Sequence, residues 1–379
     1  MKHRFFNVLL VFLFCFALAG GVAQPVSAQA TAGEDVVTFF QLGESEIELS
    51  GPYDSQTILF GLPSEWNLTG NATLDLLMGV SFNVAFTGNG MSQAYGGTLT
   101  VSLNRYVVAI LPINTTGEVA QRVAIPAYAL TSQRTDGRME LVLSLESGID
   151  CDISQNLNII VHSSSQFTLP HELTQPDTSL IKFPRPLYQD TITEDSALVV
   201  MPDNPNAAEM QSALTVAAGL GNLTGGNILL DLTTLGQLTA EQKAAGNLIL
   251  VGNAASLPIL GELTMPITVS AGQFKLDAGG ENDGVVAMVN SPWSLSRVVL
   301  VVSGNTDEGT IKAAQAISTG LLRPNTSPNL SIVETVETVP NPVNIPVDQT
   351  LADLGYNRDM LERLGVSTVS YTFYIPPGQ

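Results

Sequence analysis

The 379-residue chain carries 15 basic and 35 acidic side chains, a formal net charge of −20 at pH 7, and 45% of its residues are hydrophobic. That apolar fraction is enough to fill ordinary cores and excludes wholesale disorder, and the length suits two or three domains. The acidic balance excludes nucleic acid as a partner, because no basic surface is available to neutralise phosphates.

The N-terminus has the pattern of an export signal. Lys2 and Arg4 precede an apolar run over residues 8–19, and Val26-Ser27-Ala28 resembles a small-residue cleavage site. The alternative is a membrane anchor, but a span needs about 20 apolar residues and this run is shorter. We therefore expect residues 1–28 to be a cleaved signal peptide and the mature protein to be exported. One cysteine, Cys151, then remains, so no intramolecular disulfide can form.

Residues 36–169 have the pattern of an all-β domain. Short apolar runs separated by Gly, Pro, Asn and Asp predict about eight strands, which is typical of a β-sandwich or jelly roll. Leu141, Leu143 and Leu145 alternate with more polar residues and predict one buried strand face. The expected strands are 36–42, 47–49, 57–60, 98–103, 106–111, 119–125, 139–145 and 157–162.

The pattern then changes twice. Residues 170–195 hold four prolines and predict a linker or an extended strap between domains. Over residues 196–322, predicted strands (197–201, 228–232, 248–251, 285–289, 298–302) alternate with predicted helices (206–220, 240–245, 307–321). Such alternation indicates a largely parallel sheet with helices on its faces.

The last segment is β-like again from about residue 332. Its stretch Tyr371–Pro377 repeats the apolar strand and proline turn of Thr57–Pro63. We interpret residues 340–379 as the start of a second, incomplete β-sandwich, so that the chain resembles an N-terminal fragment of a longer protein.

Three motifs resemble ligand-binding motifs, but the sequence around each of them favours a simpler interpretation. The glycine-rich run 219–226 follows a helix and precedes a strand, the reverse of a dinucleotide loop, and indicates a helix cap and turn. The acidic loop 277–284 could hold calcium but lacks the final glutamate of an EF-hand loop, which favours a plain turn. Arg134 and Arg138 followed by Asp152 faintly resemble the cyclic di-GMP motif of PilZ domains, but Leu157 stands where that motif has glycine. We predict no catalytic, metal or cofactor site.

Catalysis is the weaker interpretation of these residues. No GxSxG motif occurs, and the two mature histidines, His162 and His171, have no nucleophile motif nearby. Carboxylates alone leave a glycosidase open. Binding of sugar by a sandwich uses exposed rings, and Trp66 and Tyr53 are our candidate carbohydrate-binding residues, with Tyr95 and Tyr106 also available. The alternative for each ring is a place in the core; for Trp66, a plug at one end of the sandwich.

Several stretches together resemble the regulatory, periplasmic subunit of bacterial cellulose synthase, the BcsB type. They are Thr98–Asn104, Asp283–Trp293, Val299–Gly309, Thr350–Tyr356 and Tyr371–Gly378, in the order signal, sandwich, strap, α/β domain and second sandwich. The resemblance implies a carbohydrate-binding-like jelly roll followed by a flavodoxin-like domain. In that domain the loop over residues 202–205, acidic and rich in proline, would repel a flavin phosphate.

The resemblance also implies a non-catalytic role beside the glycosyltransferase that makes cellulose from UDP-glucose. Such subunits lie on the periplasmic face and are held by a C-terminal membrane helix, which is absent from this chain, and the cyclic di-GMP site belongs to the PilZ domain of the catalytic subunit. We therefore expect an exported accessory subunit that supports polymer synthesis and guides the glucan. The alternatives are a free secreted carbohydrate-binding or adhesion protein, and an α/β hydrolase with a β appendage.

Overall fold

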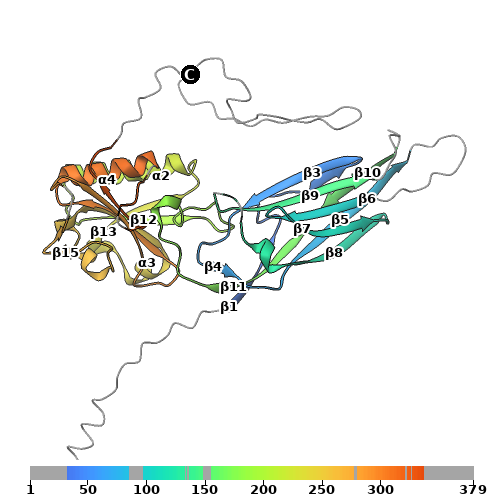
Figure 1. Ribbon diagram of the computed structural model, residues 1–379, viewed down its shortest axis with the longest axis horizontal. Coiled ribbons are helices and arrows are strands. Elements are labelled where there is room, and N and C mark those ends of the chain that lie inside the picture. The colour runs from blue at the N-terminus through green and yellow to red at the C-terminus, as the bar shows by residue number, and fades with distance from the viewer. Residues whose placement is uncertain are drawn as a thin grey trace, which may run out of the picture. The chain divides into compact units, whose positions relative to one another are not determined.

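The computed structural model describes residues 32–336, apart from 85–96, 133, 135, 148–154, 277–279, 321 and 326. These residues form a β-sandwich followed by an α/β domain (Figure 1). The predicted signal peptide, Cys151, Asp152 and the predicted second sandwich at 340–379 lie outside the described residues. No helix in the described part of the chain is long and apolar enough to cross a membrane.

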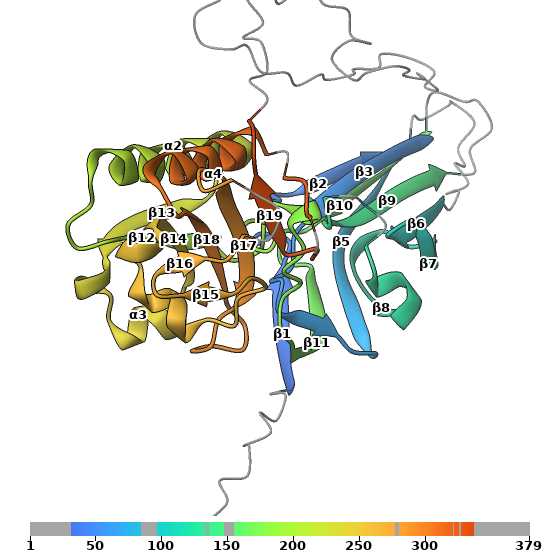
Figure 2. The same cartoon turned by 60° about the vertical axis from the view of Figure 1, so that its left-hand side comes forward.

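The sandwich consists of two antiparallel sheets (Figure 2). The larger sheet contains β1 (Ala32–Thr38), β2 (Ile47–Ser50), β4 (Trp66–Leu68), β5 (Ala72–Val84), β8 (Gly117–Ile125), β10 (Gln155–Val161) and β11 (Gln166–Leu173). The smaller sheet has the order β3 (Tyr53–Phe60), β9 (Met139–Ser147), β6 (Gly97–Leu103) and β7 (Tyr106–Ile113). Between β8 and β9 the chain forms a 3₁₀ turn, η1 (Ala127–Leu130).

Strict alternation builds the core between these sheets. In β5 the side chains of Leu74, Leu76 and Met78 are all fully buried, while the residues between them face outward. The predicted alternation of Leu141, Leu143 and Leu145 in β9 is present in the same way. Burial of such a side chain contributes about 1.5–3 kcal/mol, so these two central strands account for much of the stability of the sandwich.

The sandwich has more strands than its sequence pattern predicted, because β4, β5 and β11 were missed. Asp75 and Gly79 interrupt the apolar pattern of β5, yet both lie on its outer face, where Asp75 pairs with Arg122 of the neighbouring β8 at 2.6 Å. The strand β11 runs through Pro170 to Leu173, residues that the proline pattern had assigned to the linker.

The α/β domain has a six-stranded sheet with the order β13 (Leu229–Thr234), β12 (Ser196–Met201), β14 (Asn247–Asn253), β18 (Val298–Gly304), β17 (Gly284–Asn290) and β19 (Leu330–Val333). The first four strands pair in parallel, whereas β17 pairs antiparallel with both of its neighbours. The β-like pattern near residue 332, which we assigned to a second sandwich, thus includes the edge strand of this sheet.

The two faces of this sheet are covered differently. Both long helices, α2 (Ala207–Leu223) and α4 (Asp307–Thr319), pack on one face (Figure 1). The opposite face is covered by the short helix α3 (Ala240–Ala245), the 3₁₀ turns η3 (Leu235–Gln237), η4 (Ala254–Ser256) and η5 (Pro258–Glu262), and the hairpin β15–β16 (Val269–Ser270 and Gln273–Phe274). We expected helices on both faces of the sheet. In the described part of the chain, the second face carries one α-helix, the short α3, and is otherwise covered by 3₁₀ turns and the hairpin.

Local signals fix the two long helices. Asn206 caps α2 in a capping box with Glu209, and Gly320 ends α4 with φ +68°. The helix α2 continues past the predicted end at Leu220 as far as Leu223. Gly219 therefore lies within the helix, where its lack of a side chain lets α4 approach closely. A Cβ on Gly219 would lie 2.5 Å from the Cα of Ser318.

The segment after β11 is more ordered than a solvent-exposed strap. It contains the 3₁₀ turn η2 (Leu180–Lys182), and Leu180 and Leu187 are fully buried in the core of the α/β domain. Prolines in this segment shape turns, as where Leu187 N donates to the carbonyl of Pro184. The predicted linker is therefore largely part of the second domain.

Candidate functional site

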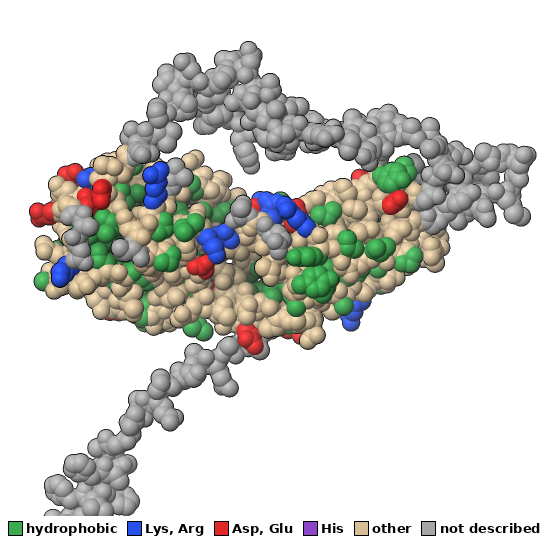
Figure 3. Space-filling model, viewed as in Figure 1, with side chains coloured by type: hydrophobic (Ala, Val, Ile, Leu, Met, Phe, Trp, Pro, Cys, Tyr) green, Lys and Arg blue, Asp and Glu red, His purple; other side chains and the backbone are tan. Residues whose placement is uncertain are grey.

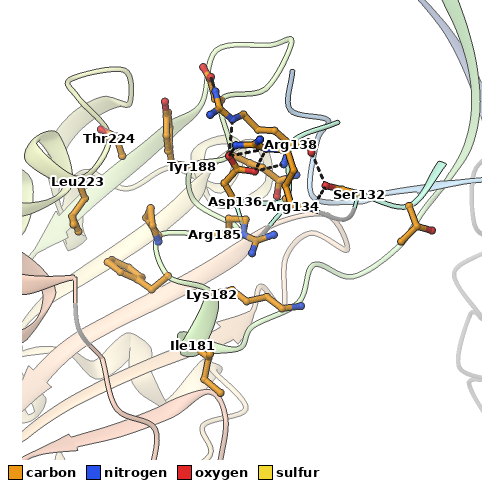
Figure 4. A pocket seen from close by; sticks show the side chains of 16 residues that line it. Ser132, Arg134, Asp136, Arg138, Ile181, Lys182, Arg185, Tyr188, Leu223 and Thr224 are labelled. Carbon is orange, nitrogen blue, oxygen red and sulfur yellow. Dashed lines mark hydrogen bonds and ion pairs between the residues drawn. The ribbon is translucent and has the colours of Figure 1, made fainter. Parts of the chain in front are cut away.

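An open groove of about 920 Å³ lies among the described residues (Figure 4). The loop between η1 and β9 forms one wall, and residues 181–190 with the end of α2 form the rest. Its polar lining includes Thr131, Ser132, Arg134, Asp136, Arg138, Lys182, Arg185, Tyr188, Gln189, Asp190 and Thr224. We call this cavity the charge-paired groove.

One wall of the groove is a turn built around a carboxylate. Arg134 donates to Asp136 through Nε and Nη2, at 2.9 and 2.6 Å, and Arg138 donates through Nε at 3.1 Å (Figure 4). The Arg134 guanidinium, assisted by Arg138, holds the pKa of Asp136 well below its usual range. Gly137 has φ +76°, a left-handed backbone conformation that favours glycine, and a Cβ there would also displace the guanidinium of Arg185.

Three of the cations in the groove lining, Arg134, Arg138 and Lys182, form ion pairs with carboxylates. Besides Asp136, Arg138 pairs with Asp190 at 3.1 Å, and Lys182 pairs with Asp177 at 2.6 Å. Such a surface offers both hydrogen-bond donors and acceptors, and most of its cations are compensated by a carboxylate. It suits a neutral, hydroxyl-rich ligand better than a phosphodiester, which needs uncompensated cations. Both arginines of the PilZ-like motif are thus engaged within the turn, and Asp152 lies outside the described residues.

The structure places the two predicted sugar-binding rings apart. Trp66 lies in β4, half-buried, with one face stacked on the imidazole of His171 at a centroid distance of 3.9 Å. Tyr53 is 51% exposed at the start of β3. The eight residues of β3, at about 3.3 Å each, separate Tyr53 from the strand end that leads to Trp66. Their binding of carbohydrate stays a prediction.

Sequence reasoning missed a second aromatic pair. Tyr128 in η1 is 60% exposed and meets Tyr106 of β7 edge to face, with ring centroids 5.1 Å apart. Hydrophobic side chains gather on the face of the sandwich seen in Figure 3. Tyr106 was among the available rings, but Tyr128 has no sequence signal, because a 3₁₀ turn has no periodic pattern to reveal it.

Carboxylates occupy the edge of the α/β sheet where such folds often bind phosphate. Glu209 accepts hydrogen bonds from the backbone of Asn206 and Asn253, both at 2.9 Å. Asp307 accepts from the side chains of the same two asparagines, and these bonds lower its pKa. The helix N-termini at this edge are therefore occupied by anionic groups of the chain itself, which supports our expectation that no flavin binds.

The acidic loop before β17 gives no sign of a metal site within the described residues. Asp283 accepts a hydrogen bond from the backbone of Gly280 at 2.7 Å, the geometry of a turn, and Asp277 lies outside the described residues. No group of His, Cys, Asp and Glu in the described part of the chain could hold a metal ion.

Comparison with known protein families shows which family the chain belongs to. A model of the first CBM domain of cellulose synthase BcsB matches residues 32–172, and a model of the first FD domain of the same protein matches residues 179–329. The chain belongs to the cellulose synthase BcsB family. The two matched BcsB domains coincide with the sandwich and the α/β domain, and they identify the chain as a cellulose synthase subunit.

Solved structures resemble the chain only distantly. A family two carbohydrate esterase from Cellvibrio japonicus is 11% identical, with 54% of this chain and 53% of that chain covered and a TM-score of 0.16. The infectious bursal virus derived T=1 particle is 12% identical over 40% of each chain, with a TM-score of 0.18. The chain thus spans about half the length of the first of these structures. No curated protein matches the chain.

Proposed function

We propose that this chain is a non-catalytic accessory subunit of a membrane cellulose synthase, which supports polymer synthesis and guides the glucan outside the membrane. The observation that carries the proposal is the match of both folded domains to consecutive BcsB domains, over residues 32–172 and 179–329. The absence of a nucleophile motif from the sequence supports a binding role over a hydrolytic one.

The charge-paired groove supports a neutral polysaccharide as the ligand. Arg134 and Arg138 are held by Asp136 and Asp190, and all four side chains line the cavity, where their remaining donors and acceptors are available to a ligand. Hydroxyl groups of a glucan can both donate to and accept from such a lining. A polymer that moves along the surface also needs weak contacts, because tight binding would stall it.

The cellular setting follows from the predicted signal peptide. We place the mature chain on the periplasmic face, beside the catalytic subunit that polymerises UDP-glucose. Membrane attachment comes through that partner, and cyclic di-GMP acts on the catalytic subunit. No flavin, metal or nucleic acid takes part in this role.

Co-purification tests the proposal. The full chain is expressed with the catalytic subunit, membranes are solubilised in mild detergent, and the catalytic subunit is captured through a tag. We expect the chain to be retained in a fixed ratio. A chain that is secreted alone and never retained, although it binds β-glucan, would instead be the free carbohydrate-binding protein.

A further inference from the structure

Two exposed tyrosines stand together at one end of β7. Tyr106 is 40% and Tyr128 60% exposed, although aromatic rings of this size usually bury most of their surface. They meet edge to face, with centroids 5.1 Å apart and an interplanar angle of 73°. In this geometry each ring packs against the other, and flat ring surface remains exposed to solvent.

One buried side chain holds both rings in place. Asn104 is 1% exposed; its amide donates to the carbonyl of Ala129 at 2.8 Å and accepts from the backbone of Glu140 at 3.0 Å. Asn104 and Arg105 form the two-residue turn before Tyr106, with φ +51° and +70°, as a type I′ hairpin requires. The turn that carries Tyr106 is thus tied to the 3₁₀ turn that carries Tyr128.

Paired charges link the turn that precedes Tyr106 to the charge-paired groove. Arg105 lies 3.8 Å from Glu140, and Glu140 lies 3.9 Å from Arg134, which lines the groove. Thr131 and Ser132, also in the groove lining, directly follow η1. The two tyrosines are therefore connected, through neighbouring residues and ion pairs, to the wall of the groove that the sandwich contributes.

We propose that Tyr106 and Tyr128 form a stacking ledge for a β-linked glucan chain that continues into the charge-paired groove. The C–H face of a pyranose ring packs on a flat aromatic ring, and its equatorial hydroxyls reach polar groups beside the ring, here Arg105 and Glu140. Arg105 and Glu140 pair with each other, so this surface offers little net charge to a charged partner, which favours a neutral polymer. The assignment rests on the proposed function, since it names where that glucan binds.

Affinity electrophoresis of the full chain in gels containing hydroxyethylcellulose tests the ledge. Loss of one stacking ring removes up to about 1.5 kcal/mol, so Tyr106→Ala and Tyr128→Ala should each weaken retardation up to about tenfold. Tyr128→Phe keeps the ring and should keep binding. Ile110→Ser is the matched control, because Ile110 is an exposed apolar residue of the same strand, 64% exposed, without an aromatic face.

The outcomes separate the ledge from the proposed function. Wild-type retardation that survives both tyrosine variants but is lost in Trp66→Ala would overturn the ledge and leave the accessory role intact. An equal loss in Ile110→Ser would show a general apolar docking surface for protein and would also overturn it. A wild-type chain that is not retarded contradicts the ledge, whereas the accessory role is decided by co-purification with the catalytic subunit. Unchanged urea midpoints in the variants show that each effect is on binding.

Discussion

Removal of the Asn104 side chain should destabilise the sandwich well beyond the usual cost of a turn substitution. In Asn104→Ala, the carbonyl of Ala129 and the backbone N–H of Glu140 lose their partners. An unsatisfied buried group costs about 1–3 kcal/mol; Glu140 lies near the surface, so we take about 1 kcal/mol for each of the two. The left-handed backbone of residue 104 adds about 1 kcal/mol for alanine, and the expected total loss is about 3 kcal/mol.

Asn71→Ala is the matched control. Asn71 has φ +74° and is exposed, and its side chain makes no hydrogen bond within the described residues. Its substitution therefore measures the backbone cost alone, about 1 kcal/mol. The difference between the two variants, about 2 kcal/mol, isolates the hydrogen bonds of the buried amide.

Tryptophan fluorescence can follow the sandwich by itself. The chain has two tryptophans, Trp66 in the sandwich and Trp293 in the α/β domain. In a Trp293→Phe background, urea titration of Trp66 emission reports unfolding of the sandwich. Equal losses of unfolding free energy in Asn104→Ala and Asn71→Ala would refute the reasoning, because the buried amide would then contribute nothing beyond its backbone conformation.

Three further predictions concern helix packing, pH and cofactors. Gly219→Ala should destabilise the α/β domain by about 1–3 kcal/mol, because its Cβ would meet the backbone of α4. Gly221→Ala in the same helix meets nothing within 4 Å and should stabilise the domain by up to about 1 kcal/mol. Urea titration of Trp293 emission compares the two variants, and changes in unfolding free energy of the same sign would contradict the packing. The pKa of His162 is raised from 6.5 by hydrogen bonds to Glu46 and Glu118, so its contribution to stability is full below about pH 6.5 and is lost as the pH rises through the raised value. His162→Gln should therefore flatten that part of the plot of stability against pH. An unchanged slope would count against the interaction of His162 with the two glutamates. Purified protein should show no flavin absorbance and no saturable binding of FMN by calorimetry, since Glu209 and Asp307 occupy the helix N-termini; micromolar binding would contradict this.

Elements with their own local signals could be predicted from the sequence. The helix α4 has acidic residues in its first turn and Gly320 after its last, and its structure follows that pattern. Strand β9 alternates without interruption and was found. Strand β5 has the same alternation, but Asp75 and Gly79 hid it, because the partner that makes Asp75 acceptable, Arg122, is distant in the sequence.

The candidate sites were harder to predict, because they depend on pairings between distant segments. The polar turn before Trp66 singled this ring out, yet its stacking on His171 arises only when β4 pairs with β11. Leu180 and Leu187 are buried through irregular turns, so a proline-rich composition indicated a strap instead. The position of Tyr128 depends on a hydrogen bond between Asn104 and Ala129, which no local pattern encodes.

Glucan synthesis in reconstituted vesicles tests the central claim most directly. The catalytic subunit is incorporated alone or together with the full chain, and incorporation of labelled glucose from UDP-glucose into insoluble polymer is measured in the presence of cyclic di-GMP. We expect the chain to increase polymer formation while it makes no polymer on its own and hydrolyses none. Synthesis that is unchanged by the chain at every ratio would contradict its role as an accessory subunit of cellulose synthase.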